Sequence, residues 1–93
     1  MAQTREIRPS REDILEALRD IIIVNLRMED IKPEDINEGT DLVDKFSLDS
    51  IDRLEMEVCV QDKFGVRITL DEFDFNSVIV GQVIDVILSA WIS

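Results

Sequence analysis

The sequence predicts a small all-α protein: a bundle of three main helices and a short third helix, with a long loop between helices one and two. Apolar residues recur at helical spacing in three stretches, over about residues 11–27, 50–64 and 77–92. A chain of 93 residues that is 45% apolar can close one hydrophobic core and has no length for a second. We therefore expect a flexible N-terminal arm over residues 1–9 and a single domain over residues 10–93.

The first helix is expected over about residues 11–27. Ser10 is placed to cap it, and Asp13 lies where a carboxylate meets unpaired backbone N–H groups and the positive end of the helix dipole. Residues 28–40 then form a long polar connection in which Pro33 interrupts any helix, followed by a short helical turn at 42–46. The stripe that predicts the first helix consists of Ile14, Leu15, Leu18, Ile21, Ile22 and Leu26.

The second main helix is expected to begin at Asp49 or Ser50 and to run to about Phe64, because Gly65 suits the left-handed position that ends helices. Met56 lies at the edge between two faces, where it serves either a docking surface or the core. An apolar face carries Ile51, Leu54, Val58 and Cys59, and an acidic face carries Asp52, Glu55 and Asp62.

Two further helices complete the expected bundle. Residues 66–68 alternate like a strand without a partner and are expected to form an extended link, and Thr69 with Glu72 has the spacing of a capping box for a short helix over about 70–73. Asn76 or Ser77 is expected to cap the last helix, where Gly81 permits close helix contact. Its apolar stripe consists of Val80, Val83, Ile84, Ile87, Leu88 and Trp91.

Composition excludes several classes of function. The chain has no histidine, which removes the His-assisted serine nucleophile and His metal ligands, so an independent enzyme is not expected. Cys59 is the only cysteine, so no intrachain disulfide forms, and we interpret it as a small buried apolar residue. No metal site is expected, because 41–44 and 71–74 lack the alternating ligands and central glycine of an EF-hand loop.

The charge is strongly acidic and unevenly distributed. The net charge is −11; residues 1–32 hold 7 acidic and 6 basic side chains, and residues 33–93 hold 14 and 4. The negative electrostatic field of these residues repels nucleic acid and attracts proteins with Lys/Arg patches. The alternative is that the acidic residues only keep the surface solvated. No segment resembles a signal peptide or reaches the ~18 apolar residues of a membrane span, so we expect a cytoplasmic monomer.

Ser50 permits two interpretations. Serine is a favoured N-cap, and Ser50 lies where a cap belongs, although Asp49 can also serve. Alternatively, a hydroxyl at a helix start is exposed, and a phosphate attached to it would meet the positive dipole end and free N–H groups. Periodicity alone does not decide between these interpretations.

The motif around Ser50 resembles the acyl carrier proteins. The similar segments are Thr40-Asp41-Leu42-Val43, Asp49-Ser50-Ile51-Asp52 with Leu54-Glu55-Met56, and Phe64-Gly65-Val66-Arg67-Ile68. The likeness extends from about Ile14 to Ile92, including the long first loop, the helix order and the acidic charge. It implies an acyl-carrier-like four-helix bundle whose Ser50 receives a covalent 4′-phosphopantetheine arm from coenzyme A.

The resemblance also implies partners. A phosphopantetheinyl transferase would attach the arm, and acyl-transferring or synthase enzymes with basic docking patches would exchange acyl chains with it in fatty acid, lipid or polyketide synthesis. An unmodified acidic interaction module and a peptidyl or aminoacyl carrier are the alternatives. The expected partner-binding residues are Asp49, Ile51, Asp52, Glu55, Met56, Glu57 and Asp62.

The chain departs from the family pattern just before the motif and within the helix that follows it. Many members have Leu-Gly-x-Asp-Ser, whereas this chain has Phe46-Ser47-Leu48 before the motif, and Arg53 and Glu57 replace residues that are often neutral or apolar. These departures favour a dedicated carrier over a housekeeping one. An acyl chain sheltered between the second and last helices, by Leu54, Val58, Val80 and Ile84, is a further hypothesis, with ordinary core packing as the alternative.

Overall fold

The structure of the protein is a computed structural model that describes residues 9–28, 30–70, 73 and 76–92. Within these residues the fold is all-α, as predicted, and contains no strand; a single isolated bridge pairs Asp41 with Ile79. In chain order the elements are α1 (Arg11–Asp20), the π-helix η2 (Ile21–Asn25), the 3₁₀ turn η3 (Pro33–Asp35), α2 (Leu42–Phe46), α3 (Ser50–Phe64) and α4 (Val80–Ile92).

Helix α1 begins as its sequence predicts and ends differently. The Asp13 N–H donates to the Ser10 hydroxyl at 3.1 Å, and the Ser10 N–H donates to Asp13 at 3.4 Å, which completes a capping box. The last turn of the expected helix widens into η2, where the Leu26 N–H donates to the Ile21 carbonyl five residues earlier. Both Ile21 and its neighbour Ile22 are buried in this arrangement.

The long loop between α1 and α3 is held by one buried anchor and one carboxylate. Ile36 is fully buried, and Asp41 caps α2, the short helical turn that the sequence predicts, by accepting from the N–H groups of Val43 and Asp44. Asp41 also accepts from Ser77 before α4. This loop and the start of α4 are therefore fixed to one another.

The bounds predicted for α3 are confirmed, but the buried face is not the predicted one. Helix α3 ends at Phe64 with Gly65 left-handed at φ 73°. The expected apolar face is solvent-exposed, with exposed fractions of 71% for Ile51, 60% for Leu54 and 63% for Val58. The inward face carries Arg53, Met56 and Val60 instead. Because Leu54 and Val58 face outward, the hypothesis that they shelter an acyl chain against α4 is wrong.

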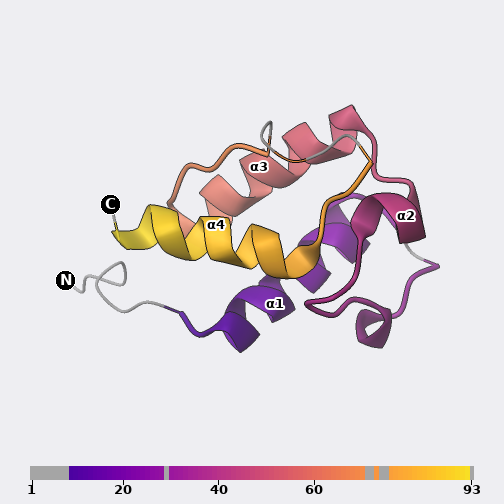
Figure 1. The fold of residues 1–93 in the computed structure, drawn as a ribbon, viewed down its shortest axis with the longest axis horizontal. Helices are drawn as coiled ribbons and strands as arrows, with labels where there is room; N and C mark the ends of the chain where they lie inside the picture. Colours follow the sequence, from indigo (N-terminus) through magenta and orange to yellow (C-terminus); the bar gives the residue numbers. More distant parts are fainter. Residues whose placement is uncertain (1–8, 29, 71–72, 74–75, 93) are drawn as a thin grey trace.

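The chain after α3 runs back along that helix toward the end where Ser50 lies (Figure 1). The link expected over residues 66–68 lies outside any helix, and through residue 70 buried Val66, Ile68 and Leu70 alternate with exposed residues, as in an extended chain. The helix expected over 70–73 falls mostly outside the described residues. At its two described ends, the Phe73 N–H donates to the Leu70 carbonyl at 3.1 Å.

Helix α4 begins at Val80, later than its sequence predicts. The segment before it is held extended because the Leu42 N–H donates to the Val78 carbonyl and the Val80 N–H donates to the Thr40 carbonyl. The Ser77 hydroxyl donates to Asp41 at 2.9 Å instead of capping α4. The prediction of a cap at Asn76 or Ser77 is therefore wrong, since loop carbonyls satisfy N–H groups at this helix start.

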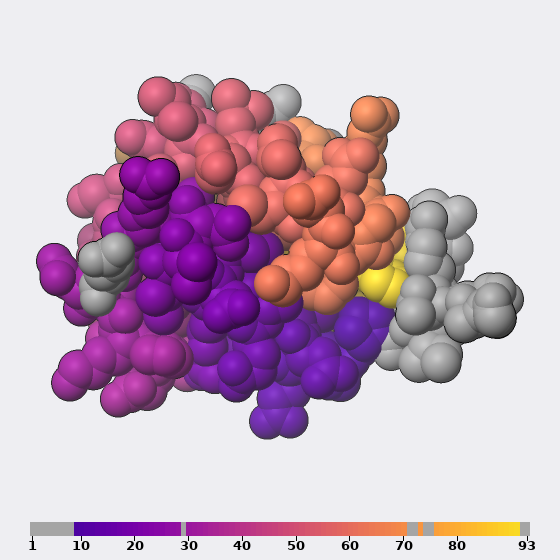
Figure 2. Space-filling view, turned by 180° about the vertical axis from the view of Figure 1, so that it is seen from behind, coloured from indigo at the N-terminus to yellow at the C-terminus, as the bar shows by residue number. Residues whose placement is uncertain are grey.

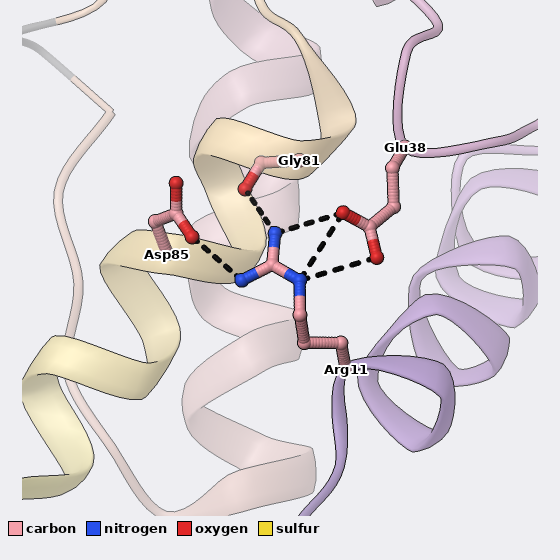
Figure 3. A network of polar contacts seen from close by, with 4 residues as sticks. All are labelled: Arg11, Glu38, Gly81 and Asp85. Atoms are coloured by element: carbon pink, nitrogen blue, oxygen red, sulfur yellow. Dashed lines mark hydrogen bonds and ion pairs between the residues drawn. The ribbon is translucent and has the colours of Figure 1, made fainter.

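Gly81 allows the long loop, rather than a second helix, to approach α4 closely. Its N–H donates to the Glu38 carbonyl at 2.8 Å, and a Cβ at this position would lie 3.0 Å from the same oxygen. Arg11 reinforces the contact, with 2.8 Å to Glu38 and 2.7 Å to Asp85 of α4 (Figure 3). The start of α1, the loop and α4 thus meet at one guanidinium.

The core lies between the three long helices. Seen from behind, α1 and η2 occupy the middle of the molecule, with the end of α3 and the link after it beside them (Figure 2). Among the described residues, no helix is both long and apolar enough to cross a membrane. The best-buried large side chains are Ile14, Leu18, Ile21, Ile22, Ile36, Leu42, Met56, Leu70, Ile84 and Ile87.

Candidate cofactor attachment site

The chain enters the site through a left-handed turn and a buried leucine. Ser47 ends α2 with φ 59° and ψ 43°, a conformation that glycine adopts without steric cost. Leu48 is buried, with 4% of its surface exposed, and its N–H donates to the Leu42 carbonyl at 3.3 Å. Leu48 therefore holds this turn on the core and leaves the next two residues, Asp49 and Ser50, exposed.

The cap of α3 is Asp49, and Ser50 is the first helical residue. Asp49 Oδ1 accepts the Asp52 N–H at 2.8 Å, and Asp52 Oδ2 accepts the Asp49 N–H at 3.3 Å. The interpretation of Ser50 as the N-cap is therefore wrong. Among the described residues its hydroxyl has no hydrogen-bond partner, so it is exposed and available.

The local electrostatics are acidic. Partial burial raises the pKa of Asp52, and the neighbouring charges of Asp49 and Glu55 raise it further, although the bond from the Asp49 N–H opposes this. The positive end of the α3 dipole lies at the same place, with the first-turn N–H groups of Ser50 and Ile51 beside the hydroxyl. A phosphate ester on Ser50 fits this position, because it meets the dipole and needs no buried space.

The outer face of α3, defined here by Ile51, Leu54, Glu55, Val58 and Asp62, is fully described and exposed. Its three apolar members follow one another at helical spacing along the helix from the residue after Ser50. Monomeric proteins seldom leave an ordered apolar row in water without a use. The outer face of α3 therefore combines a row of exposed apolar side chains with the two exposed carboxylates of Glu55 and Asp62.

Four of the expected partner-binding residues do not belong to that face. Met56 is fully buried, so the core position that its pattern also permitted is confirmed, and we remove it from the docking set. Glu57 is half-buried, and its carboxylate accepts the Leu70 N–H at 2.7 Å. Asp49 and Asp52 are both engaged in the capping box, with Asp49 exposed and Asp52 half-buried.

Sequence reasoning missed the outward position of Leu54 and Val58 and the inward position of Arg53. Arg53 Nη1 donates to the Phe73 carbonyl at 3.4 Å, and only 8% of the residue is exposed. The signal available in the sequence was the three-residue spacing of Arg53 and Met56, which places both on one face of the helix. The long aliphatic stem of an arginine can pack in a core while its head group finds hydrogen-bond acceptors.

Cys59 is half-buried, and burial raises the pKa of its thiol, with Glu55 and Asp62 adding to the effect. It is thus a poor nucleophile at neutral pH. No cluster of three or more His, Cys, Asp or Glu residues that could hold a metal ion is found in the described part of the chain.

Comparison with known proteins defines the class. A family model described as "Phosphopantetheine attachment site" matches residues 14–86. This range contains Ser50 and the helix that it begins, together with the loop and link that hold this helix in place. The match defines a carrier domain that bears a covalent 4′-phosphopantetheine group.

Curated relatives give the particular family. An acyl carrier protein of Acidothermus cellulolyticus is 35% identical over 86 residues, covering 90% of this chain and 95% of the relative. Acyl carrier proteins of two Caulobacter vibrioides strains are each 34% identical over 59 residues, covering 63% of this chain and 72% of the relative. No solved structure matches significantly. The chain belongs to the acyl carrier protein family, whose members carry groups and are not catalysts.

Proposed function

We propose that Ser50 is the attachment site of the 4′-phosphopantetheine arm and that the protein presents acyl groups to partner enzymes from this position. The observation that carries the proposal is that Asp49, and not Ser50, caps α3, so that the Ser50 hydroxyl is exposed and has no hydrogen-bond partner among the described residues. Two other nucleophilic side chains are less available than Ser50. The Thr40 hydroxyl makes a hydrogen bond within the fold, and the Cys59 thiol is half-buried.

The attachment chemistry belongs to a separate transferase. With coenzyme A and Mg²⁺ held by the transferase, the Ser50 oxygen would attack the pantetheine-side phosphorus; a new P–O bond would form, the pyrophosphate bond would break, and adenosine bisphosphate would leave. The hydroxyl proton would pass to a base on the transferase. Once attached, the group supplies a thiol that holds an acyl chain as a thioester.

The outer face of α3 supports docking of such enzymes. Glu55 and Asp62 are exposed carboxylates available to Lys/Arg, and Ile51, Leu54 and Val58 supply apolar contact between them. An exposed ion pair contributes only ~0.2–1 kcal/mol, so each partner is held weakly and released readily. Weak, salt-sensitive binding suits a carrier that visits several enzymes in turn. Fatty acid, lipid or polyketide synthesis is the proposed setting.

A reconstitution experiment tests the proposal. The purified protein is incubated with coenzyme A, Mg²⁺ and a broad-specificity phosphopantetheinyl transferase, and its intact mass is measured. The wild type should gain the mass of one arm and Ser50→Ala should gain none. Ser47→Ala is the matched control, because it removes an exposed hydroxyl three residues earlier and should be modified like the wild type.

The second candidate function is an unmodified protein-interaction module. It is favoured by the same exposed apolar row on α3, which would bind a basic partner whether or not Ser50 is modified. A wild-type protein that gains no mass under conditions that modify a known carrier would favour this second function and contradict the first.

A further inference from the structure

Arg53 and Glu57, two of the positions at which this chain departs from the family pattern, act together in the structure. They lie one turn apart on the inward side of α3. Arg53 donates to the Phe73 carbonyl at 3.4 Å, and Glu57 accepts the Leu70 N–H at 2.7 Å. The two unusual side chains thus hold Leu70 and Phe73 to the helix that begins at Ser50.

Arg53 is also the only buried charged residue in the described part of the chain. It lies three residues after Ser50 on the same helix, whereas the buried residues farther along this side of α3, Met56 and Val60, are apolar. On α3, the buried side chain nearest to Ser50 in sequence is therefore polar. The apolar interior begins one turn farther along the helix.

From this arrangement we infer that Arg53 closes the bundle beside Ser50 to long apolar chains, so that the carrier's cargo is a short or polar acyl group that stays outside the core. This inference rests on the proposed function and adds to it a class of cargo. A hydrocarbon chain that entered between α3 and the two described residues Leu70 and Phe73 would have to separate Arg53 from Phe73 and Glu57 from Leu70.

The physical reason is the cost of leaving a buried guanidinium beside hydrocarbon. Arginine stays charged at any accessible pH, so it cannot relieve the contact by losing a proton. Buried polar groups that lose their partners cost more free energy than the hydrogen bonds contribute while they are made. A cargo with oxygen acceptors, or one too short to reach the core, avoids this cost.

Two hollows described in the fold lie away from Arg53. One, of about 150 Å³, lies between η2 and the second half of α3 and is lined by Ile21, Cys59 and Lys63 among others. Another, of about 290 Å³, lies between the long loop and α2, beside Met28, Ile31 and Phe46. Neither is lined by residues of α4 or by the 66–70 link.

The test compares acyl chains of different length on the same protein. The transferase is given acetyl-coenzyme A or octanoyl-coenzyme A as donor, intact mass confirms loading, and the melting temperature of each loaded form is measured. A chain sheltered in the core raises the melting temperature, because ligand bound only to the folded state stabilises it. The wild type should show less than about 2 °C between its acetyl and octanoyl forms.

Substitutions at Arg53 test the cause. Arg53→Met keeps length without charge and should open the route, so that its octanoyl form melts higher than its acetyl form by an amount of the order of 4–8 °C. Arg53→Lys keeps a charge and should behave as the wild type does. Arg53→Gln, a shorter neutral side chain, replaces Arg53→Met if the latter loses its helical circular dichroism, and the same gain is expected.

Two results would overturn the inference while leaving the proposed function intact: a wild type stabilised by octanoyl relative to acetyl, or neutral variants at Arg53 that show no such gain. Failure of the proposed function looks different, since no donor would then add mass to the wild type. In that case the inference falls with it, before any melting temperature is compared.

Discussion

Asp49 and Asp52 cap the same helix reciprocally: each carboxylate accepts the backbone N–H of the other residue, at 2.8 and 3.3 Å. The exchange places two carboxylates on either side of Ser50 in the chain and uses neither its hydroxyl nor its backbone oxygen. A residue that looks like a helix cap from its type and position is thereby released from that task. The stability of α3 and the chemistry of Ser50 are separate properties of neighbouring residues.

This separation predicts different costs for two alanine substitutions. Asp49→Ala removes the cap and should lower the free energy of unfolding by about 1 kcal/mol, within the ~0.5–2 kcal/mol range of lost caps. Ser50→Ala should change it by less than about 0.5 kcal/mol, as for an exposed residue without internal bonds. Urea unfolding of the unmodified proteins measures both. A Ser50→Ala variant as unstable as Asp49→Ala would show that the hydroxyl does cap the helix.

Ser47 predicts a stabilising substitution. It occupies the place of the glycine in the family's Leu-Gly-x-Asp-Ser pattern and already has the left-handed backbone that glycine favours, with φ 59°. Ser47→Gly should raise the free energy of unfolding by about 0.5–1 kcal/mol, because the steric cost of a Cβ in this region disappears. Ser47→Ala keeps the Cβ and should not gain. Thermal unfolding of Ser47→Gly and Ser47→Ala measures the difference. Equal melting temperatures for the two variants would contradict the explanation that the Cβ of Ser47 is strained.

The substitution Gly81→Ala is expected to destabilise the protein, although alanine ordinarily favours helices. Alanine is better than glycine in a helix by about 0.5–1 kcal/mol, but its Cβ would lie 3.0 Å from the Glu38 carbonyl oxygen. Overpacking of this kind costs about 1–3 kcal/mol, so Gly81→Ala should be destabilising by about 1 kcal/mol overall. Gln82→Ala, at the exposed next position, is the control. A stabilised Gly81→Ala would mean that the loop gives way easily.

Asp41 predicts a loss of stability in acid. Burial raises the pKa of Asp41, but bonds donated by the Ser77 hydroxyl and the N–H groups of Val78, Asp44 and Val43 outweigh it, so the pKa lies below the ordinary 3.8. A depressed native pKa gives stability that is complete above the unfolded value and is lost as pH falls through the native one.

The comparison that isolates this carboxylate is with Asp41→Asn. At neutral pH the wild type should be the more stable protein in urea unfolding, and the difference should shrink as pH is lowered below 3.8. Other acidic groups affect both proteins alike, so the difference between them reports on Asp41. A difference that stays constant down to pH values well below 3.8 would contradict the assignment.

The outer face of α3 predicts how charge reversal affects arm attachment. Glu55→Lys combined with Asp62→Lys should slow modification by a transferase roughly tenfold at low salt, since two weak attractions become repulsions. Raising the salt concentration should narrow the gap. Glu12→Lys with Glu34→Lys makes the same change in net charge on exposed positions of α1 and η3. If this control slows attachment equally, the net charge matters and the face does not.

Local patterns predicted much of the fold. Ser10 and Asp13 at the start of α1, Gly65 at the end of α3, and the short α2 follow from cap and turn chemistry that depends on a few adjacent residues. The late start of α4 did not follow, because it depends on loop carbonyls of Glu38 and Thr40 that are distant in sequence. Tertiary hydrogen bonds of this kind leave no local signal.

The exposed positions of Ser50 and of Glu55 and Asp62 agree with the sequence analysis, but the buried face of α3 does not. Ser50 and the exposed carboxylates of α3 follow from the motif and the charge pattern, whereas the inward face of α3 was assigned to the wrong residues. Apolar Leu54 and Val58 suggested a core that the fold builds from Arg53 and Met56. The rule that apolar residues face inward fails on a helix whose outer face is itself apolar, and a long arginine stem can replace an aliphatic side chain.

The central claim is that Ser50 carries the arm in the living cell. The most direct measurement is tandem mass spectrometry of the protein purified from its own host, with the modified residue located in the peptide that contains α3. The arm, free or acylated, should be found on Ser50 and on no other residue. Protein that is unmodified in growing cells, or an arm on Ser47 or any other side chain, would contradict the claim.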